Sequence, residues 1–302
     1  MTKMQAQVRY GRTELSVSAL CIGTSGWDHI SAPEAVALLG AATSDGVNFV
    51  DTSNIYAGGR AETTLGAAFA TPALSGRFVL QTKLDRNPVT GDFGYQQMFT
   101  SLQESLDRLG LDRLQVLMLH DPEHIGFQQA MVRGGPVDAL VEMREQGLAD
   151  HIGISGGPVD MLQQFVETDI FDSLITHNRL TLLDQSADAL LTAATERDLG
   201  ITNAAPFGAG ILTGDPRFAG RYAYAPISPE REAAFQRLVA VCADLGIPLG
   251  AAALQFSLRD SRVHSTVVGI SSERRLQEAL TWANTPISDA DWTQIQQAGT
   301  AP

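Results

Sequence analysis

Short apolar runs alternate with longer amphipathic segments along almost the whole chain. The apolar runs predict eight strands, at 20–22, 47–50, 78–81, 114–119, 151–154, 173–176, 200–203 and 264–268. Helical periodicity lies between them, at about 32–45, 60–70, 94–109, 131–146, 157–168, 184–198, 229–260 (two helices divided at Pro248) and 271–283. Strands of this kind, alternating with helices, predict a parallel sheet covered on both faces.

Eight strand–helix units in 302 residues predict one α/β domain spanning residues 1–302, a closed (β/α)8 TIM barrel. An open, doubly wound sheet is the alternative. Residues 7–18 predict an N-terminal β-hairpin that turns at Gly11-Arg12 and covers the bottom of the barrel. The stretch 206–229 is rich in glycine and proline, and a loop of this length in a compact domain is typically functional.

The net charge of −13 and the pI near 4.8 argue against nucleic acid or an anionic membrane as a partner, because phosphate binding needs a basic face. The only cysteines, Cys21 and Cys242, lie in apolar or helical patterns and are expected to be buried thiols, which suits a reducing compartment. No signal peptide or long apolar stretch is evident. We therefore expect a soluble, cytoplasmic protein. Its oligomeric state is left open.

Polar residues end three successive predicted strands. Asp51 follows the second strand, Lys83 ends the third and His120 ends the fourth. Active sites of TIM barrels lie at these strand ends, and adjacent strands are only about 4.8 Å apart, so the three side chains are expected to converge. Tyr56, on the loop after Asp51, can reach the same place.

Each of these residues alone also has an ordinary structural explanation, such as a cap, a loop aromatic, a paired lysine or a core histidine. Together they form a chemically coherent set. Asp51 can pair with Lys83, whose ammonium is expected to lower the pKa of Tyr56, and His120 can orient a substrate oxygen. Such a tyrosine is a general acid or base for a carbonyl or alcohol oxygen, which suits hydride transfer.

Several blocks of the chain resemble the aldo-keto reductase family. They are "GVNFVDTSNIYAGGRAETTLG", "FVLQTKL", "SLQESLDRLGLDRLQVLMLHDPE", "LADHIGIS" and "VVGISSERRLQEAL", in the family's order. The resemblance implies a (β/α)8 barrel that uses a nicotinamide cofactor without a Rossmann domain. The family's catalytic tetrad corresponds to Asp51, Tyr56, Lys83 and His120.

The resemblance also implies a set of cofactor-binding residues. Ser155 and either His177 or Asn178 would hold the carboxamide, although the family's usual asparagine after the serine is Gly156 here. The loop "NAAPFGAGILTG" would meet the pyrophosphate through its backbone, and its spacing does not fit a Rossmann fingerprint. The full set is Gly23, Thr24, Ser155, His177, Asn178, Phe207, Gly208, Gly210, Leu212, Arg275 and Glu278.

The cofactor is expected to be NAD in preference to NADP. Many NADP-dependent relatives carry a Lys-Ser pair for the 2′-phosphate, and the aligned positions here are Gly269 and Ile270. A dianionic phosphate needs a charged partner, which Arg274 or Arg275 could still supply. Dual use of the two cofactors therefore remains open.

The blocks "THNRLTLLD" and "NAAPFGAGILTG" resemble the sugar-dehydrogenase branch of the family. This implies oxidation of the anomeric hydroxyl of an aldose (L-fucose, D-arabinose or L-galactose) to a lactone, with Tyr56 as the base. Alternatives are a pyridoxal 4-dehydrogenase, an NADPH-dependent aldehyde or ketone reductase, or a non-enzymatic cofactor sensor like potassium-channel beta subunits.

Substrate contacts are expected at the rim of the barrel. Trp27 is either an apolar wall for a sugar or a packing residue. His29, Asp121 and Glu123 would bond hydroxyls or lie solvated in loops, and residues 217–224 would cover a ligand or form a surface excursion. The scattered histidines lack metal-ligand spacing, so no metal site is expected.

Overall fold

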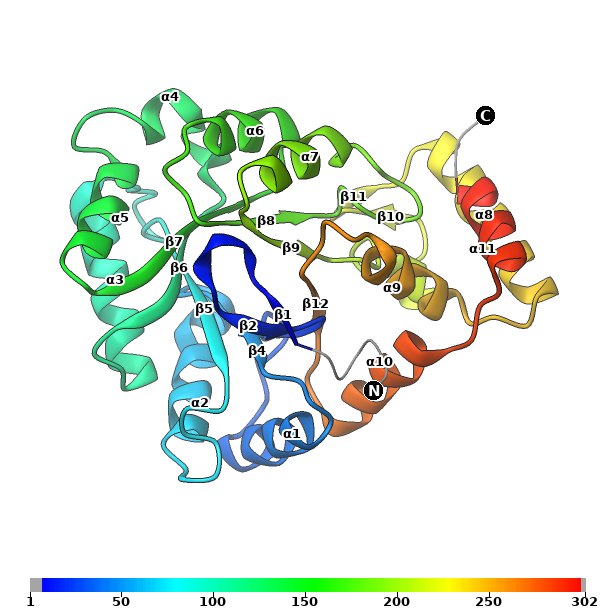
Figure 1. Ribbon diagram of the computed structural model, residues 1–302, viewed down its shortest axis with the longest axis horizontal. Helices are drawn as coiled ribbons and strands as arrows, with labels where there is room; N and C mark the ends of the chain where they lie inside the picture. Colours follow the sequence, from blue (N-terminus) through cyan, green and yellow to red (C-terminus); the bar gives the residue numbers. More distant parts are fainter. Residues whose placement is uncertain (1–6, 300–302) are drawn as a thin grey trace.

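The computed structural model describes residues 7–299, and residues 1–6 and 300–302 of the predicted domain lie outside this part. Eight parallel strands close into a barrel in the order β12-β3-β4-β5-β6-β7-β8-β9 (Figure 1). The closed barrel is confirmed and the open sheet is excluded. The strands are β3 (Leu20–Gly23), β4 (Phe49–Asp51), β5 (Val79–Leu84), β6 (Leu114–His120), β7 (Ala149–Gly156), β8 (Ser173–His177), β9 (Gly200–Ala204) and β12 (Ser265–Gly269).

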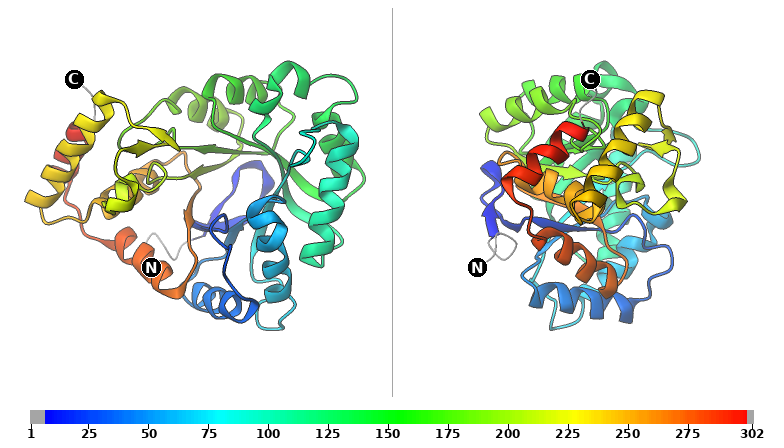
Figure 2. Two further views of the ribbon diagram at one scale, coloured as in Figure 1. Left: turned by 180° about the vertical axis from the view of Figure 1, so that it is seen from behind. Right: turned by 90° about the vertical axis from the view of Figure 1, so that its right-hand side faces the viewer.

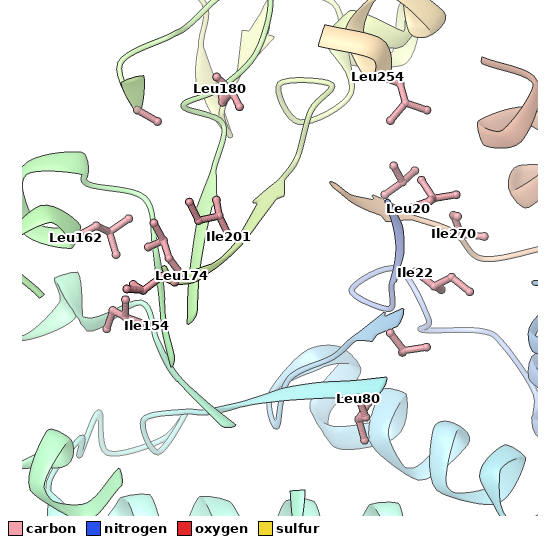
Figure 3. Close-up of a cluster of buried hydrophobic side chains, with 14 of the residues drawn as sticks. Leu20, Ile22, Leu80, Ile154, Leu162, Leu174, Leu180, Ile201, Leu254 and Ile270 are labelled. Atoms are coloured by element: carbon pink, nitrogen blue, oxygen red, sulfur yellow. The ribbon is translucent and has the colours of Figure 1, made fainter. Parts of the chain in front are cut away.

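A ring of helices surrounds the strands, and apolar side chains fill the layer between them. Figure 3 shows Ile154 of β7, Leu174 of β8 and Leu162 of α6 side by side in this layer. The helices are α1 (Ala32–Ser44), α2 (Arg60–Phe69), α3 (Tyr95–Leu109), α4 (Gly126–Ala130), α5 (Pro136–Glu145), α6 (Val159–Glu167), α7 (Asp188–Glu196), α8 (Pro229–Asp244), α9 (Leu249–Arg259), α10 (Glu273–Asn284) and α11 (Asp289–Gly299).

The structure differs from the predictions at three helices, one of which is the short, unpredicted α4. The helix predicted at 131–146 begins only at Pro136. Gly134 has a left-handed φ of 74°, so the backbone just before Pro136 is not helical. Helix α11 was not predicted, and it packs on α8 outside the ring (Figure 2). The predicted division at Pro248 is confirmed.

Across residues 7–299, no single helix is long and apolar enough to cross a membrane. Helices α8 and α9 meet the length and composition criteria only as a pair, and the chain bends by 105° between them.

The strand register brings the predicted site residues to one end of the barrel. Asp51 of β4 is opposite Gln81 of β5, and His120 of β6 is opposite Ser155 of β7. Because all eight strands are parallel, their carboxyl ends form a single mouth.

The N-terminal hairpin, β1 (Gln7–Arg9) and β2 (Ser16–Ser18), lies across the centre of the strand ring in Figure 1. Its turn includes η1 (Gly11–Thr13). Tyr10 is fully buried, contacts the Phe49 ring edge-to-face at 5.3 Å, and its hydroxyl lies 2.7 Å from Thr202 Oγ1. The predicted hairpin is therefore confirmed, and it closes the end opposite the mouth.

The stretch 206–229 contains more regular structure than the predicted loop. It holds η4 (Ile211–Thr213), η5 (Pro216–Phe218) and a small hairpin of β10 (Arg221–Tyr222) and β11 (Ala225–Pro226). Tyr222 is buried against Gly208, and its hydroxyl donates to the backbone oxygen of Asn178 at 2.8 Å. This stretch is thus tied to the carboxyl end of β8.

Candidate active site

A buried ion pair lies at the base of the barrel mouth. The Lys83 ammonium is 2.8 Å from the Asp51 carboxylate, and it also donates to the backbone oxygen of Thr52 at 2.7 Å. Both side chains are almost completely buried. Burial alone would lower the pKa of Lys83, but the charge and hydrogen bonds of Asp51 and Tyr56 outweigh it and hold the pKa above its ordinary value. Lys83 is therefore a fixed cation.

A third side chain, Gln81, completes the partners of Asp51. Its amide nitrogen donates to Asp51 Oδ1 at 3.0 Å. Gln81 was not predicted, although it precedes Lys83 by two residues on β5 and so shares its face of the strand.

Tyr56 lies over this pair. Its hydroxyl oxygen accepts from Lys83 at 3.2 Å, and the ammonium is 4.7 Å from the ring centroid. The tyrosine begins the 3₁₀ segment η2 (Tyr56–Gly59), where Gly59 has a φ of 87° and a Cβ would collide with the Arg108 guanidinium. Arg108 also donates to the backbone oxygen of Asn54 at 2.9 Å, which holds the loop in place.

The predicted lowering of the Tyr56 pKa is wrong in net direction. Burial raises the pKa of Tyr56 above its ordinary value, and the Lys83 charge offsets this only in part. Tyr56 is consequently a neutral phenol. Because its oxygen already accepts from Lys83, the hydroxyl hydrogen is available to a ligand in the mouth.

His120 has an acidic partner that the sequence analysis missed. Its Nδ1 lies 2.7 Å from Asp85 Oδ1 and 3.2 Å from Ser53 Oγ. Burial alone would lower the pKa of His120, but the charge and hydrogen bond of Asp85 outweigh it and raise the pKa above its ordinary value. Asp85 follows Gln81 and Lys83 at a spacing of two, the alternation that places residues on one face of a strand. This two-residue period is the sequence signal that could have identified Asp85.

A polar cluster forms the rim beside His120. Asp121 has a left-handed φ of 45°, and its carboxylate lies 3.7 Å from His120 Nε2 and 3.7 Å from His177 Nε2. Burial alone would raise the pKa of Asp121, but these two imidazoles lower it to about 2. Glu123, from η3 (Pro122–His124), accepts from the backbone nitrogen of Gly157 at 3.3 Å.

Asp121, Glu123 and His177 offer polar atoms within 4.8 Å of one another. One buried carboxylate oxygen on each acid, Asp121 Oδ1 and Glu123 Oε2, has no hydrogen-bond partner among the described residues. The spacing would also suit a cation. Asp121 already faces two imidazoles, and the two carboxylate oxygens without a partner are hydrogen-bond acceptors.

The predicted carboxamide residues lie at neighbouring strand ends. Ser155 and Asn178 are buried, and His177 is half-buried. Asn178 Nδ2 lies 3.1 Å from His177 Nδ1, while Asn178 Oδ1 is buried without a partner among residues 7–299. A carboxamide supplies the N–H donors that such an acceptor needs. The residues present therefore fit a nicotinamide.

Gly23 ends β3 and Thr24 follows it, at the same end of the barrel. The Thr24 hydroxyl lies 2.8 Å from Thr52 Oγ1 and donates to the backbone oxygen of Asp51 at 3.1 Å. A Cβ at Gly23 would collide with Val267 of β12. In the structure both residues serve barrel packing and the position of β4.

The predicted pyrophosphate loop is held by contacts within the protein. The amides of Gly208, Gly210 and Leu212 donate to backbone oxygens of the same loop. Both glycines have positive φ, but the rings that pack where their Cβ atoms would be belong to Tyr222 and Phe218. The close approach that these glycines allow within the protein is to aromatic rings, and the phosphate contact of this loop stays a prediction. Leu212 is fully buried, and Phe207 contacts Trp282 edge-to-face at 5.5 Å.

Arg275 and Glu278 lie in the first turns of α10 and pair with each other at 2.6 Å. Arg275 also interacts electrostatically with Asp215, whose pKa is lowered to about 2, chiefly by its hydrogen bond with Arg217. Asp215 borders an apolar cavity of about 370 Å³ beside α8, which shares no lining residue with the tetrad.

Two of the predicted substrate residues occupy contrasting positions. Trp27 is completely buried and its Nε1 donates to the backbone oxygen of Ile270 at 2.8 Å, so the indole offers no face to a sugar. The packing alternative describes this residue correctly. His29 is exposed on the loop after β3.

A sequence model of the Aldo/keto reductase family matches residues 19–300, and the chain belongs to that family. Its members use nicotinamide cofactors, generally NADP. The resemblance inferred from the sequence is therefore confirmed.

Three relatives span nearly the whole chain. A D-threo-aldose 1-dehydrogenase from Pseudomonas sp is 33% identical, with 90% of each chain covered. A pyridoxal 4-dehydrogenase from Microbacterium luteolum is 28% identical, with 96% of each covered. An L-galactose dehydrogenase from Arabidopsis thaliana is 30% identical, covering 92% of this chain and 88% of the relative. The chain is thus similar to aldose and galactose dehydrogenases.

Among solved structures, an aldo-keto reductase from Bacillus halodurans in its holo form has a TM-score of 0.83. The match covers 99% of this chain and 97% of that one at 20% identity, which supports the fold.

Proposed function

We propose that this oxidoreductase oxidises the anomeric hydroxyl of an aldose, of the L-fucose, D-arabinose or L-galactose type, to a lactone. The observation that carries the proposal is the set of three hydrogen bonds that Lys83 donates. It donates to Asp51, to the Thr52 carbonyl and to Tyr56, which leaves the Tyr56 hydroxyl hydrogen free at the mouth. The similarity to aldose dehydrogenases supports an aldose as substrate.

Tyr56 is the proposed general acid or base at the reacting oxygen, and the His120 ring packs edge-to-face beside it. Their rings are 5.8 Å apart between centroids and nearly perpendicular. A single oxygen between the two can therefore contact the Tyr56 hydroxyl and the His120 imidazole together. In the reverse direction, the neutral Tyr56 donates a hydrogen bond to a carbonyl oxygen.

Sugar hydroxyls would be recognised by the rim cluster of Asp121, Glu123 and His177. Its two carboxylate oxygens that lack a hydrogen-bond partner among the described residues are acceptors, and hydroxyl groups are the donors that satisfy them. A purely apolar aldehyde would leave these oxygens without partners, which costs binding energy. The exposed His29 remains a proposed further contact.

The nicotinamide cofactor supplies the hydride acceptor when it is bound. We propose that Ser155 and Asn178 hold its carboxamide, with His177 beside them. Residues of the 207–212 loop, together with Gly23 and Thr24, would line the path of the pyrophosphate. Arg275 and Glu278 would meet the adenine end.

NAD is the proposed preference, with NADP as the second cofactor. Arg275, a predicted cation for a 2′-phosphate, is already paired with Glu278 and faces the charge of Asp215. An added phosphate dianion would compete with these two carboxylates. This argument runs against the family's general use of NADP.

The test is a matrix of initial rates. The purified protein is assayed with NAD and with NADP against L-fucose, D-arabinose, L-galactose, D-glucose and pyridoxal, and formation of reduced cofactor is followed by absorbance. We expect turnover with at least one aldose and NAD. Absence of turnover with every sugar, beside efficient NADPH-dependent aldehyde reduction, would overturn the proposal in favour of a general reductase.

The same matrix separates two other activities. Turnover of pyridoxal alone would identify a pyridoxal dehydrogenase, which the similarity to the Microbacterium luteolum enzyme supports as the second candidate. Tight cofactor binding without turnover of any carbonyl or alcohol would indicate a cofactor sensor like a potassium-channel beta subunit.

A further inference from the structure

We infer that Arg108 of α3 is a positioning residue for the proposed reaction, because its guanidinium binds the chain on both sides of Tyr56 and so holds the tyrosine hydroxyl beside Lys83. The inference rests on the proposed function, in which Tyr56 exchanges the proton of the reacting oxygen. It gives a part in the reaction to a side chain outside the barrel, on a helix that packs beside α2 (Figure 1).

One nitrogen of the Arg108 guanidinium makes both contacts. Nη1 donates at 2.9 Å to the backbone oxygen of Asn54, which lies two residues before Tyr56. The same nitrogen donates at 3.3 Å to Glu62 Oε2, in the first turn of α2. The residues between these two contacts form the loop that carries Tyr56 and η2. The guanidinium therefore joins the two ends of this loop.

The loop that Arg108 joins has a strained backbone. Ala57, Gly58 and Gly59 have φ values of 53°, 63° and 87°, three left-handed residues in succession, and the first of them carries a side chain. Residues other than glycine disfavour this region, so such a conformation persists only where surrounding contacts fix it. A Cβ at Gly59 would collide with the Arg108 guanidinium, so the loop packs directly against it. Arg108 thus supplies contacts that keep the strained loop in place.

Arg108 is itself fixed by a buried carboxylate. Glu62 is fully buried, and its Oε1 accepts from the Thr82 hydroxyl of β5 at 2.6 Å. Burial raises the pKa of Glu62, while its hydrogen bonds and the nearby guanidinium oppose this rise. A buried carboxylate that loses its cationic partner is left uncompensated. Glu62 therefore keeps the guanidinium at the loop.

The chain before Tyr56 has further anchors. The backbone nitrogen of Asn54 donates to the backbone oxygen of Lys83 at 3.3 Å, and its side chain donates to the backbone oxygen of Ser101 on α3 at 3.1 Å. Loss of the Arg108 guanidinium leaves these anchors intact and releases the later part of the loop, residues 57–59. The expected result is a displaced Tyr56 in a folded protein.

A displaced Tyr56 would be a poorer acid. Its hydroxyl accepts from Lys83 at 3.2 Å, near the upper limit of the usual range, so a small outward movement breaks this hydrogen bond. Burial raises the pKa of Tyr56 and the Lys83 charge opposes the rise, so a more distant ammonium leaves a weaker acid. Ligands would still bind, but proton exchange would be slow. Arg108 therefore acts on kcat in preference to binding constants.

The first test observes Tyr56 in the cofactor-free protein. The chain has five tyrosines, so fluorine NMR of protein labelled with fluorotyrosine gives few signals, and Tyr56→Phe assigns the one from Tyr56. Arg108→Ala should shift or broaden this signal and leave that of Tyr10, at the closed end of the barrel, unchanged. Arg113→Ala removes an exposed guanidinium paired with Asp150 and should change neither signal. An unchanged Tyr56 signal in folded Arg108→Ala overturns the inference.

The second test measures turnover of an aldose that the wild type oxidises. Arg108→Ala should lower kcat by about 10- to 100-fold, with KM and cofactor affinity within about threefold of wild type, because misplacing a reacting group slows the reaction without preventing binding. Guanidine hydrochloride at millimolar, non-denaturing concentrations should raise kcat of this variant several-fold, since the Arg108 side chain is 27% exposed and its site can be reached from solvent. Arg113→Ala should show neither loss nor rescue. A wild-type kcat, or a loss that guanidinium does not restore, contradicts the inference.

Alanine is a strong helix former, so Arg108→Ala preserves the helix propensity of α3. If this variant does not fold, Arg108→Lys decides, because lysine keeps a positive charge beside Glu62 but has one nitrogen in place of a planar fork. A shifted Tyr56 signal with a lower kcat in Arg108→Lys supports the inference, and wild-type values of both overturn it. If no aldose is oxidised, the proposed function fails while the fluorine signal still tests the position of Tyr56, so the two failures are distinguishable.

Discussion

The ammonium group of Lys83 lies 2.8 Å from the Asp51 carboxylate in the interior of the barrel mouth, and neither side chain is more than 5% exposed. Removing one partner leaves a buried charge without compensation. Lys83→Met should therefore lower the free energy of unfolding by about 3–5 kcal/mol. Urea denaturation followed by circular dichroism measures this loss.

The exposed pair of Arg113 and Asp150 provides the matched control, since its partners are 66% and 29% exposed. Arg113→Met should cost less than about 1 kcal/mol. Similar losses in the two variants would contradict the argument from burial.

Tyr56→Phe removes a hydroxyl hydrogen that has no acceptor among the described residues and that can reach a ligand oxygen. Turnover should fall by about 10²- to 10³-fold, the usual effect of losing a donor at the reacting oxygen. Cofactor affinity, measured by protein fluorescence, should stay nearly unchanged. Tyr95→Phe is the control because that hydroxyl bonds Glu142 on α5. Retention of most of the wild-type kcat in Tyr56→Phe would exclude an acid–base role.

Stability should depend on pH through His120 and Asp85. The folded pKa of His120 lies above its ordinary value of 6.5. The protonated ring therefore stabilises the folded state fully below about pH 6.5, and this contribution disappears as the pH rises through the folded pKa. Asp85→Asn should lose more stability at about pH 5 than at about pH 9.

Denaturation of both proteins at both pH values measures this difference. Comparison with the wild type cancels the opposite contribution of His264, whose pKa is lowered by burial. An equal loss at both pH values would show that Asp85 does not favour the charged ring.

Asn178 Oδ1, which has no hydrogen-bond partner within residues 7–299, predicts a contribution to cofactor binding. Asn178→Gly removes this acceptor while tolerating the left-handed φ of 59° at that position. Affinity for the oxidised cofactor should fall by about tenfold, the effect of one lost hydrogen bond of about 1.4 kcal/mol. Fluorescence titration measures the affinity. Unchanged affinity in a folded variant would show that the carboxamide binds elsewhere in the mouth.

Gly269 offers a direct test of cofactor preference. It is exposed at the end of β12, and no atom lies within 4 Å of where its Cβ would be. Gly269→Lys supplies a cation and should raise the affinity for NADP relative to NAD by about tenfold. Gly269→Met has similar bulk without charge and should leave the ratio unchanged. If both variants change the ratio of NADP to NAD affinity equally, the 2′-phosphate of the bound cofactor lies away from β12.

The tetrad was predictable because of one geometric rule. Parallel strands bring their carboxyl ends together, so Asp51, Lys83 and His120 could be placed from three sequence positions without knowing any side-chain contact. The direction in which the pKa of Tyr56 is shifted could not be obtained in this way. It depends on how much water the folded loop excludes, and that quantity is decided by the packing of distant segments.

Other residues show where a linear pattern stops being informative. Asp85 lies at the same strand period as Lys83, but its pairing with His120 depends on the side-chain directions at two strand ends. Trp27 is buried through a hydrogen bond to the backbone oxygen of Ile270, a residue far along the chain, and this contact has no local signal. The glycines at 208 and 210 show that a family motif can have a packing explanation that the motif itself does not reveal.

The hairpin residue Tyr10 has a consequence for ligand traffic. Because Tyr10 closes one end of the barrel, the proposed cofactor and substrate must both enter through the mouth at the other end. The molecule that occupies the deeper position has to enter first and leave last, and the outer one controls its release. For the proposed two-substrate reaction we therefore expect an obligatory order of addition, set by a single shared entrance at the open end of the barrel.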